Sequence, residues 1–209
     1  MKLNFSTVLG SALVTTGFVS MIAVAPAAAG PTAGTCDIQD VLLGTIPATA
    51  CEGAFQGNDT GASSTLLSDL NGGMFSSFVG ADTTWSLGAK SDDAGSWLSA
   101  DQDENSGRWS LLDTISSGTF VLSLKAGNYY SAYLFQGIDF ATTGLQGVFD
   151  TVGVAFNSNN LEGLDLSHAS IFVASGGDTT PVPEPATLLG LAVVGGGLSL
   201  SRRRKSTSC

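Results

Sequence analysis

Positively charged residues are scarce in this 209-residue chain, and most of them lie at its two ends. Eight Lys and Arg side chains oppose eighteen Asp and Glu. Five of the eight are terminal: Lys2, Arg202, Arg203, Arg204 and Lys205. Between residues 30 and 182, three cations face seventeen acids, a net charge of −14. Such a surface repels nucleic-acid phosphates, so we expect no nucleic-acid partner.

Histidine and cysteine are almost as rare, with one His and three Cys in the whole chain. One His and two distant Cys cannot build a tetrahedral zinc shell, which excludes that class of site. In an oxidising compartment Cys36 and Cys51 are natural partners, and closing a loop of this length would stabilise the fold by about 3 kcal/mol. The alternative is two reduced thiols that never meet.

The helix formers Glu, Lys and Gln are few, whereas glycine is abundant with 27 residues. Val, Thr, Phe and Tyr punctuate the middle of the chain, where apolar runs are broken by Gly, Asn, Asp or Ser about every ten residues. This rhythm predicts an all-β fold over residues 30–180. We expect an antiparallel β-sandwich, jelly-roll-like, with one short helix.

The clearest single element is a hairpin over residues 119–135. Phe120, Leu122 and Leu124 share one face, the turn is at 126–128, and the return strand carries Tyr129, Tyr133 and Phe135. Residues 64–72 read as a short helix with Ser64 as a cap and glycine at its exit. Further strands are predicted at 84–87, 108–112, 147–156 and 169–174.

The N-terminus has the features of a secretory signal peptide. A single Lys2 precedes an apolar stretch that runs from residue 5 to residue 24. Ala27 and Ala29 then supply the two small residues that a signal peptidase needs, which predicts cleavage after Ala29 and a signal peptide over residues 1–29. The alternative is an uncleaved N-terminal anchor.

The C-terminus, residues 181–209, combines three signals in a fixed order. Val182, Pro183, Glu184 and Pro185 form an extended segment, because proline continues neither a helix nor a strand ladder. Fifteen uncharged residues, 186–200, follow, and as a helix they would rise only about 22 Å, short of the roughly 30 Å hydrocarbon core. The basic cluster Arg202, Arg203, Arg204 and Lys205 would then stay on the cytoplasmic side and stop the chain in the membrane.

Together these three signals resemble the PEP-CTERM sorting signal. The resemblance implies export, recognition by a membrane-embedded exosortase near the Pro-Glu-Pro segment, and a transient stay in the inner membrane. It also implies a final place at the cell surface or in the extracellular matrix, in bacteria that make extracellular polysaccharide. It says nothing of the activity of residues 30–180. The alternative is an ordinary single-pass tail anchor.

One acidic loop is a candidate metal site. Asp101, Asp103 and Asn105 place oxygen side chains at alternate positions ahead of Gly107, and calcium prefers a ring of such oxygens. Asp92 and Asp93 could add a carboxylate if the two loops meet. The spacing departs from an EF-hand loop, so a plain solvated turn is the alternative. Apart from calcium at this loop, we expect no cofactor.

No residue is predicted to be catalytic. His168 neighbours Ser167 and Ser170, but adjacent strand residues point to opposite faces, which favours a hydrogen-bonded structural histidine over a hydrolase. A pair of acids could act as in a glycosidase, although seventeen acids place some pair together by chance. Six aromatic side chains either form a platform for sugar rings or pack in the core: Trp85, Trp97, Trp109, Tyr129, Tyr130 and Tyr133.

Three functional hypotheses follow. The first is a non-enzymatic exported protein of the cell surface or polysaccharide matrix, for which signal peptidase and an exosortase are the export partners and extracellular polysaccharide is the final one. The second is a calcium-assisted carbohydrate-binding module, and the third is a secreted hydrolase acting on matrix polymer. The first accounts for both ends and for the acidic middle.

Overall fold

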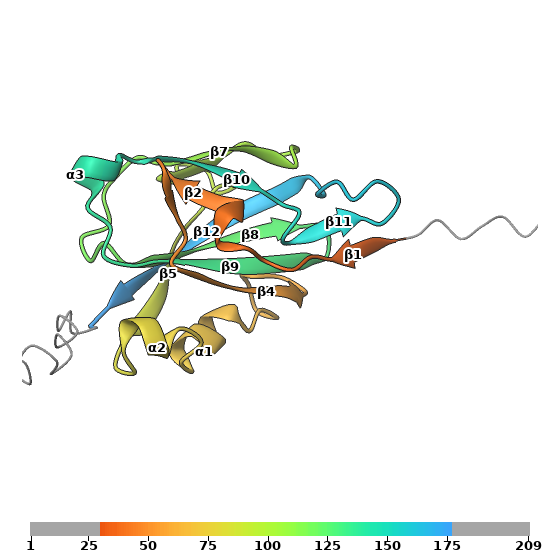
Figure 1. The fold of residues 1–209 in the computed structure, drawn as a ribbon. Helices are drawn as coiled ribbons and strands as arrows, with labels where there is room; N and C mark the ends of the chain where they lie inside the picture. Colours follow the sequence, from red (N-terminus) through yellow and green to blue (C-terminus); the bar gives the residue numbers. More distant parts are fainter. Residues whose placement is uncertain (1–29, 177–209) are drawn as a thin grey trace, which may run out of the picture.

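Two five-stranded antiparallel sheets form the framework of residues 30–176, the part of the chain that the computed structural model describes (Figure 1). The first sheet has the order β3 (Ile46–Pro47), β2 (Val41–Leu43), β10 (Gln146–Asp150), β7 (Ser106–Leu111), β6 (Leu98–Ala100). The second has the order β4 (Ala50–Gln56), β9 (Tyr129–Phe135), β8 (Phe120–Ala126), β12 (Leu166–Ser175), β5 (Thr84–Lys90). The predicted all-β, antiparallel class is confirmed.

Short elements complete the described residues. Strand β1 (Pro31–Ala33) pairs with β11 (Ala155–Asn157). A 3-10 turn, η1 (Ile38–Asp40), leads into β2, and three short helices follow: α1 (Leu66–Asn71), α2 (Ser76–Val79) and α3 (Phe140–Thr143). Figure 1 shows α1 and α2 against the second sheet, on the side away from the first sheet.

The two sheets share one apolar core between their inner faces. Trp109 of β7 crosses this space, lying 6.2 Å from Phe120 and 6.0 Å from Phe135, ring centre to ring centre. Its indole N–H donates to the Leu42 carbonyl at 3.1 Å, which satisfies the buried polar atom. Position 147 must be glycine, because a Cβ there would collide with the indole.

A second apolar cluster covers the outer face of the second sheet. Leu66, Leu70 and Phe75, from α1 and the segment after it, pack on Trp85, Val121, Tyr130, Leu134 and Phe172. All seven residues of β8 are therefore buried. The hairpin is confirmed, since Phe120 pairs with Phe135 and Ala126 with Tyr129. Its second face, which alternation alone would assign to solvent, lies under the α1–α2 segment.

Most of the other predicted elements are present with shifted ends. The predicted strands at 84–87, 108–112 and 169–174 correspond to β5, β7 and β12, and the predicted helix to α1. The Ser64 hydroxyl accepts from the Leu66 amide at 3.3 Å, and Gly72 ends the helix.

The predicted single strand over 147–156 is wrong, because it divides into β10 and β11, which belong to different sheets. Thr151 causes the break. Its buried hydroxyl donates to the Leu164 carbonyl at 2.6 Å, and its own carbonyl accepts from the Val154 amide in a turn at 2.9 Å. Five short strands carried no prediction: β1, β2, β3, β4 and β6.

Candidate functional site

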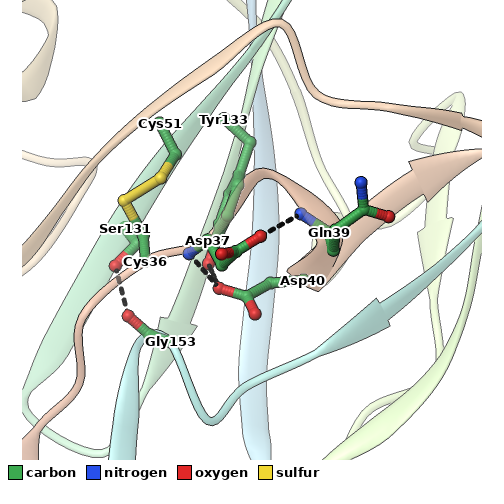
Figure 2. The surroundings of a disulfide bond; sticks show 8 residues. All are labelled: Cys36, Asp37, Gln39, Asp40, Cys51, Ser131, Tyr133 and Gly153. Atoms are coloured by element: carbon green, nitrogen blue, oxygen red, sulfur yellow. Dashed lines mark hydrogen bonds between the residues drawn. A yellow bond between two sulfur atoms is a disulfide. The ribbon is translucent and has the colours of Figure 1, made fainter.

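Cys36 and Cys51 form the predicted disulfide, with 6.1 Å between their Cα atoms (Figure 2). Cys51 lies on β4, at the edge of the second sheet, and Cys36 precedes η1, which leads into the first sheet. The bond therefore ties the entry to one sheet to the edge of the other. Closing a loop of 15 residues is worth about 3 kcal/mol in the chain-entropy model.

A half-buried carboxylate, Asp40, lies beside this disulfide (Figure 2). Its Oδ2 accepts from the Asp37 amide at 2.7 Å and from the Tyr133 hydroxyl at 3.1 Å. Burial raises the pKa of Asp40, and these two hydrogen bonds offset only part of that effect. Burial and the nearby Asp40 also raise the pKa of Tyr133. The Tyr133 hydroxyl keeps its proton, and its hydrogen bond to Asp40 fixes η1 on the second sheet.

The predicted calcium ligands lie in one loop but are engaged in holding it together. Asp101 Oδ2 accepts from the Arg108 amide at 2.8 Å, and the Asn105 carbonyl accepts from the Thr151 amide at 2.9 Å. Asp103 has a left-handed backbone, with φ 60°. The neighbouring loop does approach, since Gln102 Nε2 donates to Ser91 Oγ at 3.3 Å.

Within residues 30–176, no three His, Cys, Asp or Glu side chains come close enough together to hold a metal ion. Calcium also accepts amide and carbonyl oxygens, so the site at Asp101, Asp103 and Asn105 stays a prediction.

The six aromatic side chains serve mainly as core. Trp85, Trp109, Tyr130 and Tyr133 are buried. Trp97 and Tyr129 are partly buried and pack against the core between the sheets. The four buried rings cannot stack on a sugar in solvent, so four of the six side chains proposed for an aromatic platform do not form one.

The most distinctive polar site in the described residues surrounds His168. Its Nε2 lies 2.7 Å from Asp59 Oδ1, and its Nδ1 lies 3.9 Å from Asp92 Oδ2. The Asp59 side chain is fully buried, and that of His168 is 12 % exposed. Asp59 comes from the loop between β4 and α1, whereas His168 lies on β12, 109 residues away in sequence. The hydrogen bond predicted for His168 is present.

Neighbouring strands add polar side chains beneath Asp59. Ser170 of β12 lies opposite Ser123 of β8 and Lys90 of β5, and His168 lies opposite Lys125. Ser123, Ser170 and Lys125 are all buried. The Lys125 ammonium donates to the Gly127 carbonyl. Across the described residues, Asp59 Oδ2 and the two serine hydroxyls lack a hydrogen bond of good geometry. We call Asp59, Ser123, Lys125, His168 and Ser170 the polar cluster.

Burial and the neighbouring polar side chains have opposing effects on the pKa values of Asp59 and Lys125 in the polar cluster. Burial by itself would raise the pKa of Asp59, but the hydrogen bond and charge of His168, together with the serine hydroxyls, outweigh burial and lower it. Burial lowers the pKa of Lys125, and the Asp59 carboxylate opposes that shift. Asp59 is therefore an ionised carboxylate held inside the protein by the cations around it.

A cleft of about 380 Å³ opens beside the polar cluster. Thr60 and Gly61 from the Asp59 loop form one wall, α1 contributes Leu67 and Ser68, and Phe172 lies at its base. None of its lining residues is Lys or Arg.

The geometry around His168 does not resemble a nucleophile–base pair. Both ring nitrogens of His168 face carboxylates, and the neighbouring Ser167 is exposed. In the described part of the chain, no serine hydroxyl is hydrogen-bonded to the ring. The arrangement can hold a charge and fix a loop.

Asp59 and its buried partners escaped sequence analysis for identifiable reasons. Asp59 lies in a Gly- and Ser-rich loop, which is the composition of a solvated connection. Ser123 and Lys125 alternate with Leu122 and Leu124, as residues of a solvent face do. The one available signal was the sole histidine, because a buried histidine needs a partner and acids are abundant here.

The remaining predicted site residues lie outside the described residues: Val182, Pro183, Glu184, Pro185, Arg202, Arg203, Arg204 and Lys205. A family model of the PEP-CTERM protein-sorting motif matches residues 181–205, which include all eight. The chain carries a PEP-CTERM protein-sorting motif. The resemblance stated from the sequence is confirmed. This motif implies export, a membrane-anchored sorting signal and processing by an exosortase.

The match covers only this C-terminal segment. No curated protein and no solved structure matches the chain. Among residues 30–176, no helix has the length and apolar character needed to cross a membrane. The predicted signal peptide (1–29), the predicted membrane helix (186–200) and the boundary at residue 180 lie outside the described residues and stay predictions.

Proposed function

We propose that this PEP-CTERM protein is a non-enzymatic component of the cell surface or extracellular matrix, associated with extracellular polysaccharide. The sorting motif at residues 181–205 carries the proposal, because it is an export address and residues 30–176 precede it directly. A β-sandwich module suits that place. The disulfide that ties the entry to one sheet to the edge of the other forms and persists in an oxidising compartment such as the cell exterior.

The non-enzymatic part of the proposal draws on the chemistry of the described residues. The sole histidine is engaged with a buried carboxylate, and Asp40, the half-buried acid beside the disulfide, is held by a tyrosine hydroxyl. Neither site leaves a general base in contact with a free nucleophile. The strongly acidic surface keeps the module soluble and favours neutral or basic polymers over anionic ones.

The decisive experiment is mass spectrometry of the mature protein. The full chain is expressed in a bacterium that has an exosortase and in the same strain without it. We expect a mature N-terminus at Gly30, loss of residues after the Pro-Glu-Pro segment, and a mass two hydrogens lighter than that of the reduced chain. Full-length, cytosolic protein in the exosortase strain would refute the proposal.

A matched pair of variants tests the motif. Replacing Pro183 and Pro185 with Ala should abolish processing, because it removes the extended segment offered to the peptidase. Pro181→Ala changes a proline just outside the tripeptide and should be processed normally. Equal processing of both variants would contradict the role assigned to the motif.

The second candidate, a calcium-assisted carbohydrate-binding module, has one observation in its favour. The 101–105 and 91–93 loops meet through Gln102 and Ser91, which brings their carboxylates to one end of the module. Its test is a glycan array probed with and without chelator. Binding that disappears with chelator, and equally in Asp101→Asn, would favour this candidate over the first.

A further inference from the structure

The loop between β4 and α1, residues 57–65, is fixed to the molecule at few points. The Gly57 amide donates to the Asn128 carbonyl at 2.9 Å at one end. At the other end, the Thr65 carbonyl accepts from the Asp69 amide of α1 at 2.8 Å. Asp59 is the only one of these nine residues that is buried. The position of the loop therefore depends on what holds Asp59.

His168 meets a carboxylate at each ring nitrogen. Asp59 lies 2.7 Å from Nε2 and Asp92 lies 3.9 Å from Nδ1. A protonated imidazole has two N–H donors and can serve both carboxylates, whereas a neutral one has a single N–H and a lone pair on the other nitrogen. Loss of the proton therefore leaves one carboxylate facing a lone pair. The contact with Asp59 changes at the same time from an ion pair to a weaker hydrogen bond between a neutral N–H and the carboxylate.

The other charged side chains near the His168 ring do not replace the proton that the ring loses. Lys90, on β5, pairs with Asp92 at 3.2 Å, and Lys125, on β8, donates to the Gly127 carbonyl. Tyr130, on β9, and Asp69, on α1, lie on the same side of the second sheet. None of these side chains is of a type whose charge normally changes between pH 5 and 8, and His168 is the only histidine of the chain.

We propose that the Asp59–His168 contact is a pH-sensitive latch, which holds the 57–65 loop on the second sheet while His168 is protonated and loosens the loop when the proton is lost. Because Asp59, Thr60 and Gly61 line the 380 Å³ cleft, loosening the latch releases one wall of that cleft. An exported protein meets the pH of its surroundings, so acid conditions would keep the wall in place and alkaline conditions would free it. The inference is independent of the proposed function.

Hydrogen exchange tests the latch in the full-length chain held in detergent micelles. Exchange is followed by mass spectrometry at pH 5.5 and pH 8.0 and corrected for the intrinsic effect of pH. Peptides covering 57–65 should be roughly fivefold less protected at pH 8.0 than at pH 5.5, because an ion pair holds the Asp59 carboxylate more strongly than a neutral imidazole does. The exposed loop at 158–163, which has no histidine contact, is the internal control and should keep constant protection.

His168→Gln and Asp92→Asn separate the latch from a merely structural contact. Glutamine can still donate a hydrogen bond to Asp59 but does not titrate, so protection of the loop should become independent of pH. Asp92→Asn removes the carboxylate that faces Nδ1 and should reduce the pH effect while leaving the Asp59 contact in place. If His168→Gln does not fold, Asp92→Asn alone tests the latch. Equal protection at both pH values in the natural chain, or an unchanged pH effect in either variant, would overturn the proposal.

Discussion

The half-buried Asp40, beside the disulfide, and the fully buried Asp59, in the polar cluster, have pKa values shifted in opposite directions. Burial dominates at Asp40 and raises its pKa, because its side-chain partner is the hydroxyl of Tyr133. At Asp59 the hydrogen bond and charge of His168, together with the serine hydroxyls, outweigh burial, and the pKa is lowered. Asp59 is the more deeply buried of the two. Depth therefore does not decide the charge state, whereas the ability of the partner to carry positive charge does.

The two carboxylates contact opposite faces of the second sheet and have different tasks. The Asp40 site, on the face towards the first sheet, lies beside the covalent link Cys36–Cys51 and uses its carboxylate as a hydrogen-bond acceptor. The Asp59 site, on the other face, has no covalent link and depends on charge to keep the 57–65 loop in place. The Asp40 site should therefore respond to reductant and the Asp59 site to pH.

The largest expected effect is that of His168→Ala. It leaves the ionised Asp59 buried without its nearest cation, and breaking a buried pair in this way costs roughly 3–5 kcal/mol. The measurement is the free energy of unfolding from urea titration at pH 6. Ser167→Ala, on the exposed neighbouring residue, is the control and should stay within about 0.5 kcal/mol of the natural chain. A loss under about 1 kcal/mol in His168→Ala would show that Lys125 alone neutralises Asp59.

Local sequence patterns and residue counts are enough to predict the β8–β9 hairpin, the disulfide and the sorting motif. The β8–β9 hairpin follows from the alternation of Phe120, Leu122 and Leu124, and the disulfide follows because only two cysteines precede the sorting motif. The sorting motif itself is a contiguous string of residues. These features need no knowledge of distant contacts.

The rest depended on contacts between distant segments. Ser123 and Lys125 have the alternation of a solvent face, but both are buried, and Asp59 from the distant 57–65 loop interacts with both. The partner of His168 was one of seventeen acids, and it lies 109 residues away in the chain. Thr151 broke the predicted strand over 147–156 through a hydroxyl bond to Leu164, which no local pattern reveals.

The next effect in size is that of removing the disulfide. Replacing Cys36 and Cys51 together with Ser should cost about 3 kcal/mol in the free energy of unfolding. The same loss should appear when the natural chain is unfolded in reductant, and reductant should not change the double variant further. Protection of the 57–65 loop from hydrogen exchange should be unaffected at pH 5.5, because Asp59 and His168 do not contact the disulfide. A loss of loop protection would show that the Asp40 and Asp59 sites are coupled.

The smallest effect, and the sharpest test of the comparison, is the pH dependence of Asp40→Asn and Asp59→Asn. The folded-state pKa of Asp40 lies above its ordinary value of 3.8, so its stabilising contribution is complete below 3.8 and is lost as pH rises through the folded-state pKa. The pKa of Asp59 lies below 3.8, so its contribution is complete above 3.8 and is lost as pH falls through the folded-state pKa.

Relative to the natural chain, Asp40→Asn should therefore gain stability as pH rises from 3 to 7, whereas Asp59→Asn should lose it. Urea titrations across that range give both difference curves, and each variant is the control for the other because both replace a carboxylate with an amide. Two curves of the same sign would mean that burial, not the partner, sets both charge states. In that case the contact with His168 would not be what distinguishes the two faces of the sheet.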